Sequence, residues 1–173
     1  MTAGIAELTS AELLACAEAL TDVLADAVED GASVGFVKPL SRVQVLKWWR
    51  ARAAPVANGV LALWVARDGG RVLGTVQVRF TDTADGRHRA EVAKLIVHRD
   101  ARGAGLGRAL LEVAEQEAAK RGATLLVLDA RAGSAAERLC RRAGWVEAGV
   151  IPDHTADPDG VLWPTTLFYK RVG

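Results

Sequence analysis

The chain of 173 residues has few cysteines, little net charge and no long apolar run, and each scarcity excludes a class of protein. Cys16 and Cys140 are too few for a disulfide framework, and no Cys-x-x-Cys pair or Cys/His cluster predicts a metal site. The formal net charge of +1 gives no reason to expect nucleic acid or an anionic membrane as a partner. The longest apolar run, residues 60–66, is far shorter than the ~20 residues of a transmembrane helix. We therefore expect a cytoplasmic protein whose residues 1–173 form a single domain.

Hydrophobic periodicity predicts an α+β fold with a mixed, mostly antiparallel sheet of about seven strands and about four helices on its two faces. Helical spacing covers residues 8–29, for which Thr9 or Ser10 is the candidate cap, and residues 41–53, ending before Pro55. These helices are followed by an expected hairpin of strands 61–66 and 72–80, a strand at 90–98 and a helix ending near 122. The second half of the chain predicts a buried strand at 124–130, a short helix after Ser134, a strand at 146–151, a loop at 152–160 and a last strand at 165–171.

Three glycines stand where the strand at 90–98 gives way to the following helix. Gly103, Gly105 and Gly107 allow the backbone to approach a ligand closely, and the free N–H groups of a first helical turn favour an anion. Arg102 and Arg108 add positive charge at the same end. The stretch therefore predicts a phosphate-binding loop.

The glycine spacing separates three kinds of phosphate-binding loop. No Gly-x-x-x-x-Gly-Lys run followed by Ser or Thr exists, which excludes a P-loop. A dinucleotide fingerprint starting at Gly103 would need its third glycine at Arg108, although Asp129 stands roughly where a ribose-binding acid is expected, which keeps a nucleotide-dependent oxidoreductase as a distant alternative. The run from Arg102 to Gly107 matches Arg/Gln-x-x-Gly-x-Gly/Ala and resembles the pyrophosphate loop of the GNAT N-acetyltransferases, which bind acetyl-CoA.

The resemblance to the GNAT family covers nearly the whole chain. A second family signature, Ala-x-x-Leu-Tyr-x-x-x-Gly-Phe, is matched in part between Ala136 and Trp145. Within the family, three stretches resemble the tabtoxin-resistance-type branch: Glu91-Val-Ala-Lys-Leu95, Leu128-Asp-Ala-Arg131, and the segment from Ile151-Pro152 to Pro158-Asp-Gly160.

The resemblance implies acetyl-CoA as co-substrate, no metal, and backbone amides around Leu95 and Val97 as contacts for the pantetheine arm. It places the cofactor-binding residues on the strand, the glycine loop and the short helix: Leu95, Ile96, Val97, Arg102, Gly103, Ala104, Gly105, Leu106, Gly107, Arg108, Ala136, Cys140 and Arg142.

The resemblance also implies that Glu91 and Asp129 are catalytic, because carboxylates at the matching positions take part in catalysis in that branch. Each has a structural alternative: a salt bridge from Glu91 to Arg89 or Lys94, and a turn cap for Asp129. The usual tyrosine acid is replaced by Cys140, which is either a weak acid or a buried helix residue. Gly133 stands where the family often has asparagine.

The leading hypothesis is therefore transfer of an acetyl group from acetyl-CoA to a small amine, directly in a ternary complex. The rival is a CoA-binding regulatory or interaction domain without turnover, which the missing tyrosine and asparagine favour. Trp48, Trp49 and His154 are candidates for the acceptor site, with core packing or solvent exposure as the alternatives. We expect a monomer or a homodimer.

Overall fold

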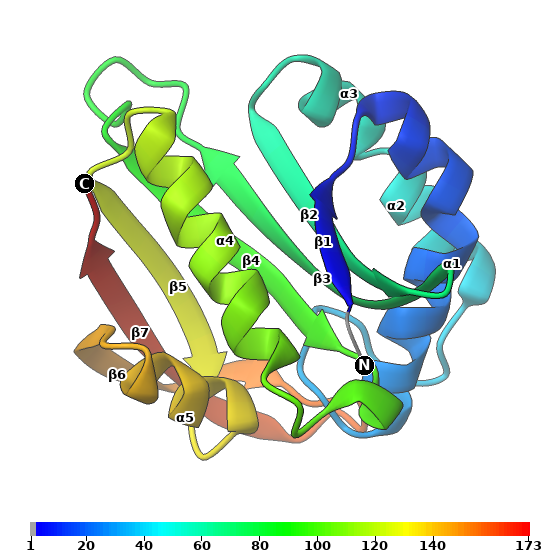
Figure 1. Cartoon of the computed structure of the whole chain (residues 1–173). Coiled ribbons are helices and arrows are strands. Elements are labelled where there is room, and N and C mark those ends of the chain that lie inside the picture. The colour runs from blue at the N-terminus through cyan, green and yellow to red at the C-terminus, as the bar shows by residue number, and fades with distance from the viewer. Residues whose placement is uncertain (1–2) are drawn as a thin grey trace.

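The computed structural model describes residues 3–173, which form one seven-stranded sheet with helices on both faces (Figure 1). The strands are β1 (Gly4–Glu7), β2 (Leu61–Asp68), β3 (Arg71–Phe80), β4 (Arg89–Val97), β5 (Leu125–Arg131), β6 (Val146–Ala156) and β7 (Leu162–Arg171). The helices are α1 (Ser10–Glu29), α2 (Arg42–Arg50), α3 (Ala53–Ala57), α4 (Leu106–Lys120) and α5 (Ala135–Arg142), with a 3₁₀ turn at Arg99–Ala101.

The strand order is β1-β2-β3-β4-β5-β7-β6, and every neighbouring pair is antiparallel except β4 and β5. The predicted mixed, mostly antiparallel α+β sheet is confirmed. The parallel pair requires a crossover connection, and α4 supplies it (Figure 1).

Two hydrophobic cores lie on opposite faces of the sheet. One packs α4 and α5 against side chains such as Val78, Val92 and Leu126, and the other packs α1 and α2 against side chains such as Leu63 and Ile96. Because alternate residues of a strand point to opposite faces, Gln77 and Arg79 share the α1–α2 face with Leu63, which pairs directly with Gln77.

The helix caps follow local sequence. Thr9 caps α1 in a reciprocal capping box with Glu12, and Ser134 caps α5 by accepting from the backbone N–H of Glu137. These two predicted caps are therefore present.

Several elements differ from expectation, among them β7, which begins at Leu162 and not at residue 165. The predicted helix over 41–53 is instead two helices, and Pro55 lies within the first turn of α3, where its missing N–H has no helical partner to lose. The expected loop at 152–160 begins later, because β6 continues through Pro152 to Ala156; β6 is an edge strand with a register shift after Ile151, where proline is tolerated. β1 was not predicted.

Candidate active site

A cleft of about 990 Å³ opens on either side of the sheet where β4 and β5 part. The two strands pair only from Arg89 to Glu91 on β4, opposite Leu125 to Val127 on β5. Beyond Glu91 they diverge toward their carboxyl ends (Figure 1). The edge of β4 that faces β5 therefore carries backbone groups that no strand pairs with over residues 92–97.

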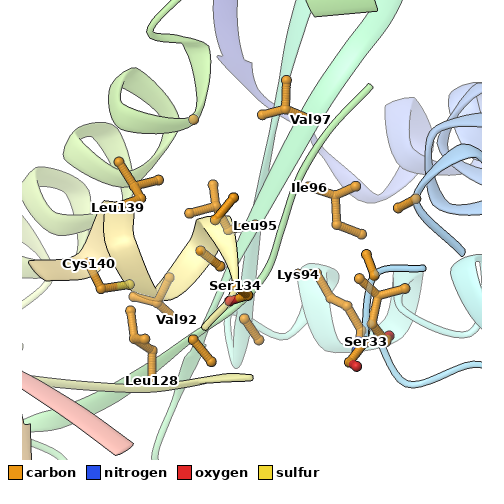
Figure 2. Close-up of a pocket in the computed structure, with 18 of the residues that line it drawn as sticks. Ser33, Val92, Lys94, Leu95, Ile96, Val97, Leu128, Ser134, Leu139 and Cys140 are labelled. Carbon is orange, nitrogen blue, oxygen red and sulfur yellow. Dashed lines mark hydrogen bonds between the residues drawn. The ribbon is translucent and has the colours of Figure 1, made fainter. Parts of the chain in front are cut away.

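A β-bulge shapes β4 at this point. The pairing of β3 with β4 shifts between Thr75 and Gln77, and Lys94 takes a left-handed backbone conformation with φ of 51°. Lys94 then turns toward the loop after α1, where its Nζ donates to the carbonyl oxygen of Val34 at 2.8 Å, while Leu95 packs against the core beneath α4. Figure 2 shows these two neighbours on opposite sides of the cleft.

The glycine loop forms one end of the cleft. Gly103 and Gly105 both have φ of +80°, a conformation that a side chain would strain, and Gly105 is the N-cap of α4. No side chain caps α4, and its first intrahelical bond runs from the N–H of Ala109 to the carbonyl of Gly105. The preceding N–H groups are thus available to an anion, as the sequence predicts.

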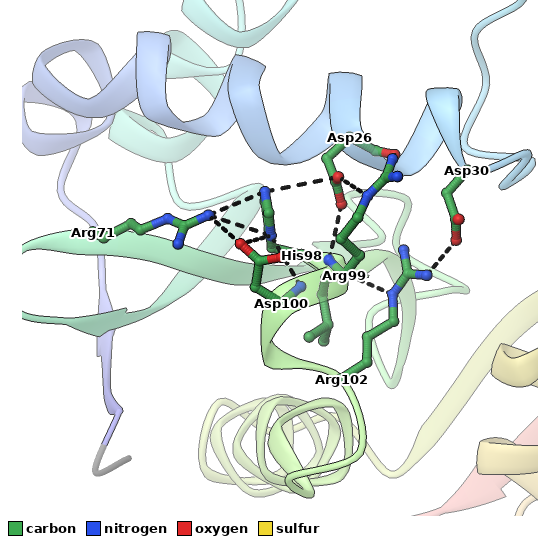
Figure 3. Close-up of polar contacts among 8 residues, drawn as sticks. Asp26, Asp30, Arg71, His98, Arg99, Asp100 and Arg102 are labelled. Carbon is green, nitrogen blue, oxygen red and sulfur yellow. Dashed lines mark hydrogen bonds and ion pairs between the residues drawn. The ribbon is translucent and has the colours of Figure 1, made fainter.

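Arginines of this loop tie it to α1 (Figure 3). Arg102 forms an ion pair with Asp30, which lowers the pKa of that carboxyl, and its Nε donates to the carbonyl of Val97 at 3.0 Å. Arg99 contacts Asp26 through its side chain and its backbone N–H. Arg102 is therefore held beside the loop, with its guanidinium between α1 and the glycines.

The structure brings nearly all the predicted site residues to this one cleft. Both carboxylates, Glu91 and Asp129, line it, and so do the cofactor-binding candidates apart from Ala104. Glu91 forms a salt bridge at 3.3 Å with Arg79, directly across the β3–β4 pair, and not with Arg89 or Lys94. The register places Glu91, Val127 and hence Asp129 on the face that carries α1 and α2.

Cys140 lines the cleft but is only 2% exposed. Burial, together with the nearby carboxylate of Glu115, raises the pKa of its thiol to about 12. It is therefore the buried helix residue of the two alternatives, and a poor proton donor. Figure 2 shows its sulfur between the helix and the side chains of β4 and β5.

The three aromatic and histidine candidates for the acceptor site differ in whether they line the cleft. Trp48 lines the cleft, whereas Trp49 is fully buried in the core. His154 is exposed on β6 and does not line the cleft, although its neighbour Thr155 does. Sequence reasoning did not assign several polar side chains to the site, since they reach the cleft from different elements through non-local packing: Asp30, Ser33, Arg52, Gln77, Arg79, Lys94, Arg131, Ser134 and Thr155.

Within residues 3–173, no group of three or more His, Cys, Asp or Glu side chains is arranged to hold a metal ion. The same described part of the chain contains no helix with the length and apolar character needed to span a membrane.

The comparisons with known proteins identify the class to which this fold and cleft belong. The profile of the Acetyltransferase (GNAT) family matches residues 18–145, and the chain belongs to that family. A ribosomal-protein-alanine N-acetyltransferase from Brucella melitensis is 27% identical, with a TM-score of 0.77 over 98% of this chain and 99% of that one.

Two similar structures hold acetyl-CoA. One is yncA from Salmonella typhimurium, a putative acetyltransferase with its cofactor acetyl-CoA, at 22% identity and a TM-score of 0.78 over 100% of this chain and 95% of that one. The other is a phosphinothricin acetyltransferase from Sinorhizobium meliloti in complex with acetyl-CoA, at 21% identity and a TM-score of 0.78 over 100% and 90%. At these sequence identities, the two similarities establish that this chain has the same fold as those proteins.

Proposed function

We propose that this protein transfers the acetyl group of acetyl-CoA to the amine of a small molecule, directly in a ternary complex. The observation that carries the proposal is the continuity of the cleft. It joins an uncapped helix start, an unpaired strand edge and two carboxylates in one space. The acetyl-CoA in two structures of the same fold supports the choice of donor.

The cofactor-binding roles divide along the cleft. The N–H groups at the start of α4, with Arg102 and Arg108, take the pyrophosphate, and the open edge of β4 from Leu95 to Val97 takes the amide-bearing pantetheine arm. Ala136, Cys140 and Arg142 of α5 lie along the opposite wall. The cleft is wide enough for both an extended arm and an acceptor.

Glu91 and Asp129 take the proton from the acceptor, directly or through water. In the reaction the amine nitrogen forms a bond to the carbonyl carbon, the carbon–sulfur bond breaks, the amine proton passes to a carboxylate, and the thiolate takes a proton from solvent. Both carboxylates lie on the α1–α2 face, where the acceptor would enter beside Trp48. Backbone N–H groups of the bulged strand stabilise the oxyanion.

The three motifs shared with the tabtoxin-resistance-type branch support placing the chain near it. Cytoplasmic location and a monomeric or homodimeric state stay predictions.

The test is acetyl-CoA binding by calorimetry together with an acetyl-CoA consumption screen over an amine library. Gly105→Glu should weaken binding at least tenfold, since it strains a φ of +80° and places a carboxylate at the pyrophosphate position. Gly160→Ala is the control, because it introduces comparable backbone strain at φ of +86° in a residue that does not line the cleft.

Unchanged affinity in Gly105→Glu would contradict this assignment of the loop. The rival function is a CoA-binding domain without turnover, favoured by the raised pKa of Cys140 where the family has a tyrosine acid. Tight binding of acetyl-CoA with no product from any amine would support that rival.

A further inference from the structure

Three buried side-chain groups that line the cleft have no hydrogen-bond partner among the described residues: the hydroxyl of Ser33 and two N–H donors, one of Gln77 and one of Arg52. Gln77 is 2% exposed and its Nε2 is unpaired, and the Nε of Arg52 is also buried and unpaired. Both side chains line the cleft: Gln77 lies on the α1–α2 face of the sheet, opposite Leu63, and Arg52 lies between α2 and α3. Leaving a buried donor unpaired is costly, so donors without a protein acceptor indicate a ligand that provides one.

The neighbouring cationic side chains Lys94, Arg131 and Arg79 have hydrogen-bond or ion-pair partners in the protein, whereas Arg52 has no carboxylate partner. Lys94 donates to the carbonyl of Val34, and Arg131 donates to the carbonyl of Gly31 at 3.2 Å, so both fasten the loop after α1. Arg79 pairs with Glu91. Among residues 3–173, no carboxylate forms an ion pair with Arg52 (none of the salt bridges involves it).

The guanidinium of Arg52 is nevertheless held in place. It stacks on the ring of Trp48 at 4.5 Å from the centroid. Trp48 is itself braced edge-to-face by Phe36 at 5.7 Å and by Trp49 at 4.9 Å. A cation fixed by packing loses little freedom when it binds an anion.

The local charge balance also favours an anion. Burial, and after it the positive charge of Arg79, lower the pKa of Arg52. Burial also lowers the pKa of Lys94, whereas the nearby carboxylates of Asp129 and Glu91 act in the opposite direction. Arg52 and Arg79 repel one another, so an anionic group bound by Arg52 would relieve the repulsion. A second cationic group, such as the far end of a polyamine, would add to it.

We propose that the acceptor is an amine that also carries a carboxylate, of the amino acid class, with the carboxylate bound by Arg52 and Gln77. This inference rests on the proposed acetyl transfer. A carboxylate accepts from both unpaired donors, and a guanidinium is suited to bind it. The amine then extends toward Glu91 and Asp129, so that opposite ends of the acceptor meet opposite charges.

The experiment compares a panel of L-amino acids, each beside its carboxamide and its decarboxylated amine, as acceptors for acetyl-CoA. We expect kcat/KM, expressed per neutral amine, to be at least tenfold higher for acids than for their amides, the scale of one charge-assisted hydrogen bond. Arg52→Gln should reduce that ratio at least tenfold through the KM of the acids, while the amides change little. Gln77→Leu should also lower the ratio of kcat/KM for acids to kcat/KM for amides.

A control variant and a binding measurement accompany this comparison. Arg50→Gln removes an exposed arginine of α2 that does not line the cleft, and should keep the ratio of the parent protein. If Arg52→Gln does not fold, the comparison of acid with amide in the parent protein still decides. Binding of N-acetyl amino acids and N-acetyl amino acid amides to the protein saturated with CoA gives the same comparison without turnover.

Equal efficiency with acids and amides in the parent protein would overturn the carboxylate site and leave acetyl transfer standing. So would an Arg52→Gln variant that loses both kinds of acceptor equally. Failure to acetylate any amine would instead count against the proposed function, and the binding comparison with N-acetyl ligands would then decide the carboxylate site separately.

Discussion

Replacing Cys140 by alanine should reduce turnover by less than about tenfold. With a pKa of about 12, its thiol would have to protonate a departing thiolate whose ordinary pKa is about 8.5. That transfer is uphill by roughly 3.5 pKa units, on the order of 5 kcal/mol, since one unit is about 1.4 kcal/mol. The departing thiolate can instead leave unprotonated and take its proton from solvent afterwards, so Cys140 should not provide the roughly 100-fold or more that a positioned acid normally contributes.

The assay is steady-state turnover with acetyl-CoA and an accepted amine, beside acetyl-CoA affinity by calorimetry. Cys140 is 2% exposed, so the alanine variant should lose about 1–2 kcal/mol of stability from the void it leaves. The assay temperature must therefore stay well below the lowered Tm.

The same burial gives a pH signature. The folded pKa of Cys140 lies above that of an unfolded cysteine, so the folded protein holds the proton longer than the unfolded chain. This contribution to stability is fully present below about pH 8.5 and is lost as the pH rises toward 12. The stability difference between parent and Cys140→Ala should accordingly shrink above pH 9.

A loss of 100-fold or more in Cys140→Ala, with normal folding and unchanged acetyl-CoA affinity, would refute this reasoning. It would show that the thiol takes part in the reaction despite its raised pKa. A stability difference that does not change with pH would refute the buried, neutral thiol on which the reasoning depends.

Two further predictions concern the two carboxylates and the close packing at Gly74. Glu91→Gln and Asp129→Asn should each keep acetyl-CoA affinity within a few-fold but cut turnover roughly 100-fold. The loss of turnover should be smaller at higher pH, because more of the acceptor amine is already neutral there. A loss of turnover that does not depend on pH, together with a lower Tm, would show that the replaced carboxylate has a structural role. Gly74→Ala should destabilise by about 1–3 kcal/mol in denaturant unfolding, because its Cβ would lie 2.9 Å from the carbonyl oxygen of Ile96 and 3.0 Å from Leu110. Gly4→Ala, whose Cβ meets nothing within 4 Å, should change stability little, and equal effects would contradict the clash.

Local signals in the sequence predict much of this fold. A cap or a hairpin depends on residues a few positions apart, as at Thr9 with Glu12 and at Ser134 with Glu137. The glycine loop is predictable for the same reason, since strand, glycines and helix follow one another in the chain. β1 gave no such signal, because four mostly exposed residues on a sheet edge show no hydrophobic pattern.

The acceptor side of the cleft could not be predicted, since its parts meet only through tertiary packing. Arg79 is the partner of Glu91 because the β3–β4 register sets them opposite, and that register depends on a bulge with no sequence signature. Arg102 meets Asp30, 72 residues earlier, only when α1 packs beside the glycine loop. The family resemblance names Glu91 and Asp129 as candidate catalytic residues, but nothing in the sequence indicates the side chains that contact them.

The bulge at Lys94 and the end of the β4–β5 ladder account together for the position of the proposed chemistry. Glu91 is the last residue of β4 that pairs with β5, so its side chain stands where the cleft begins. Three residues later the left-handed turn at Lys94 redirects the strand, and its ammonium group fixes the loop that closes the α1 side. One strand thus supplies a carboxylate, an open backbone edge and an anchor for the opposite wall. An acceptor bound against Arg52 would lie between that wall and Glu91, which is why the acid-to-amide ratio and the pH profile of Glu91→Gln test two ends of one molecule.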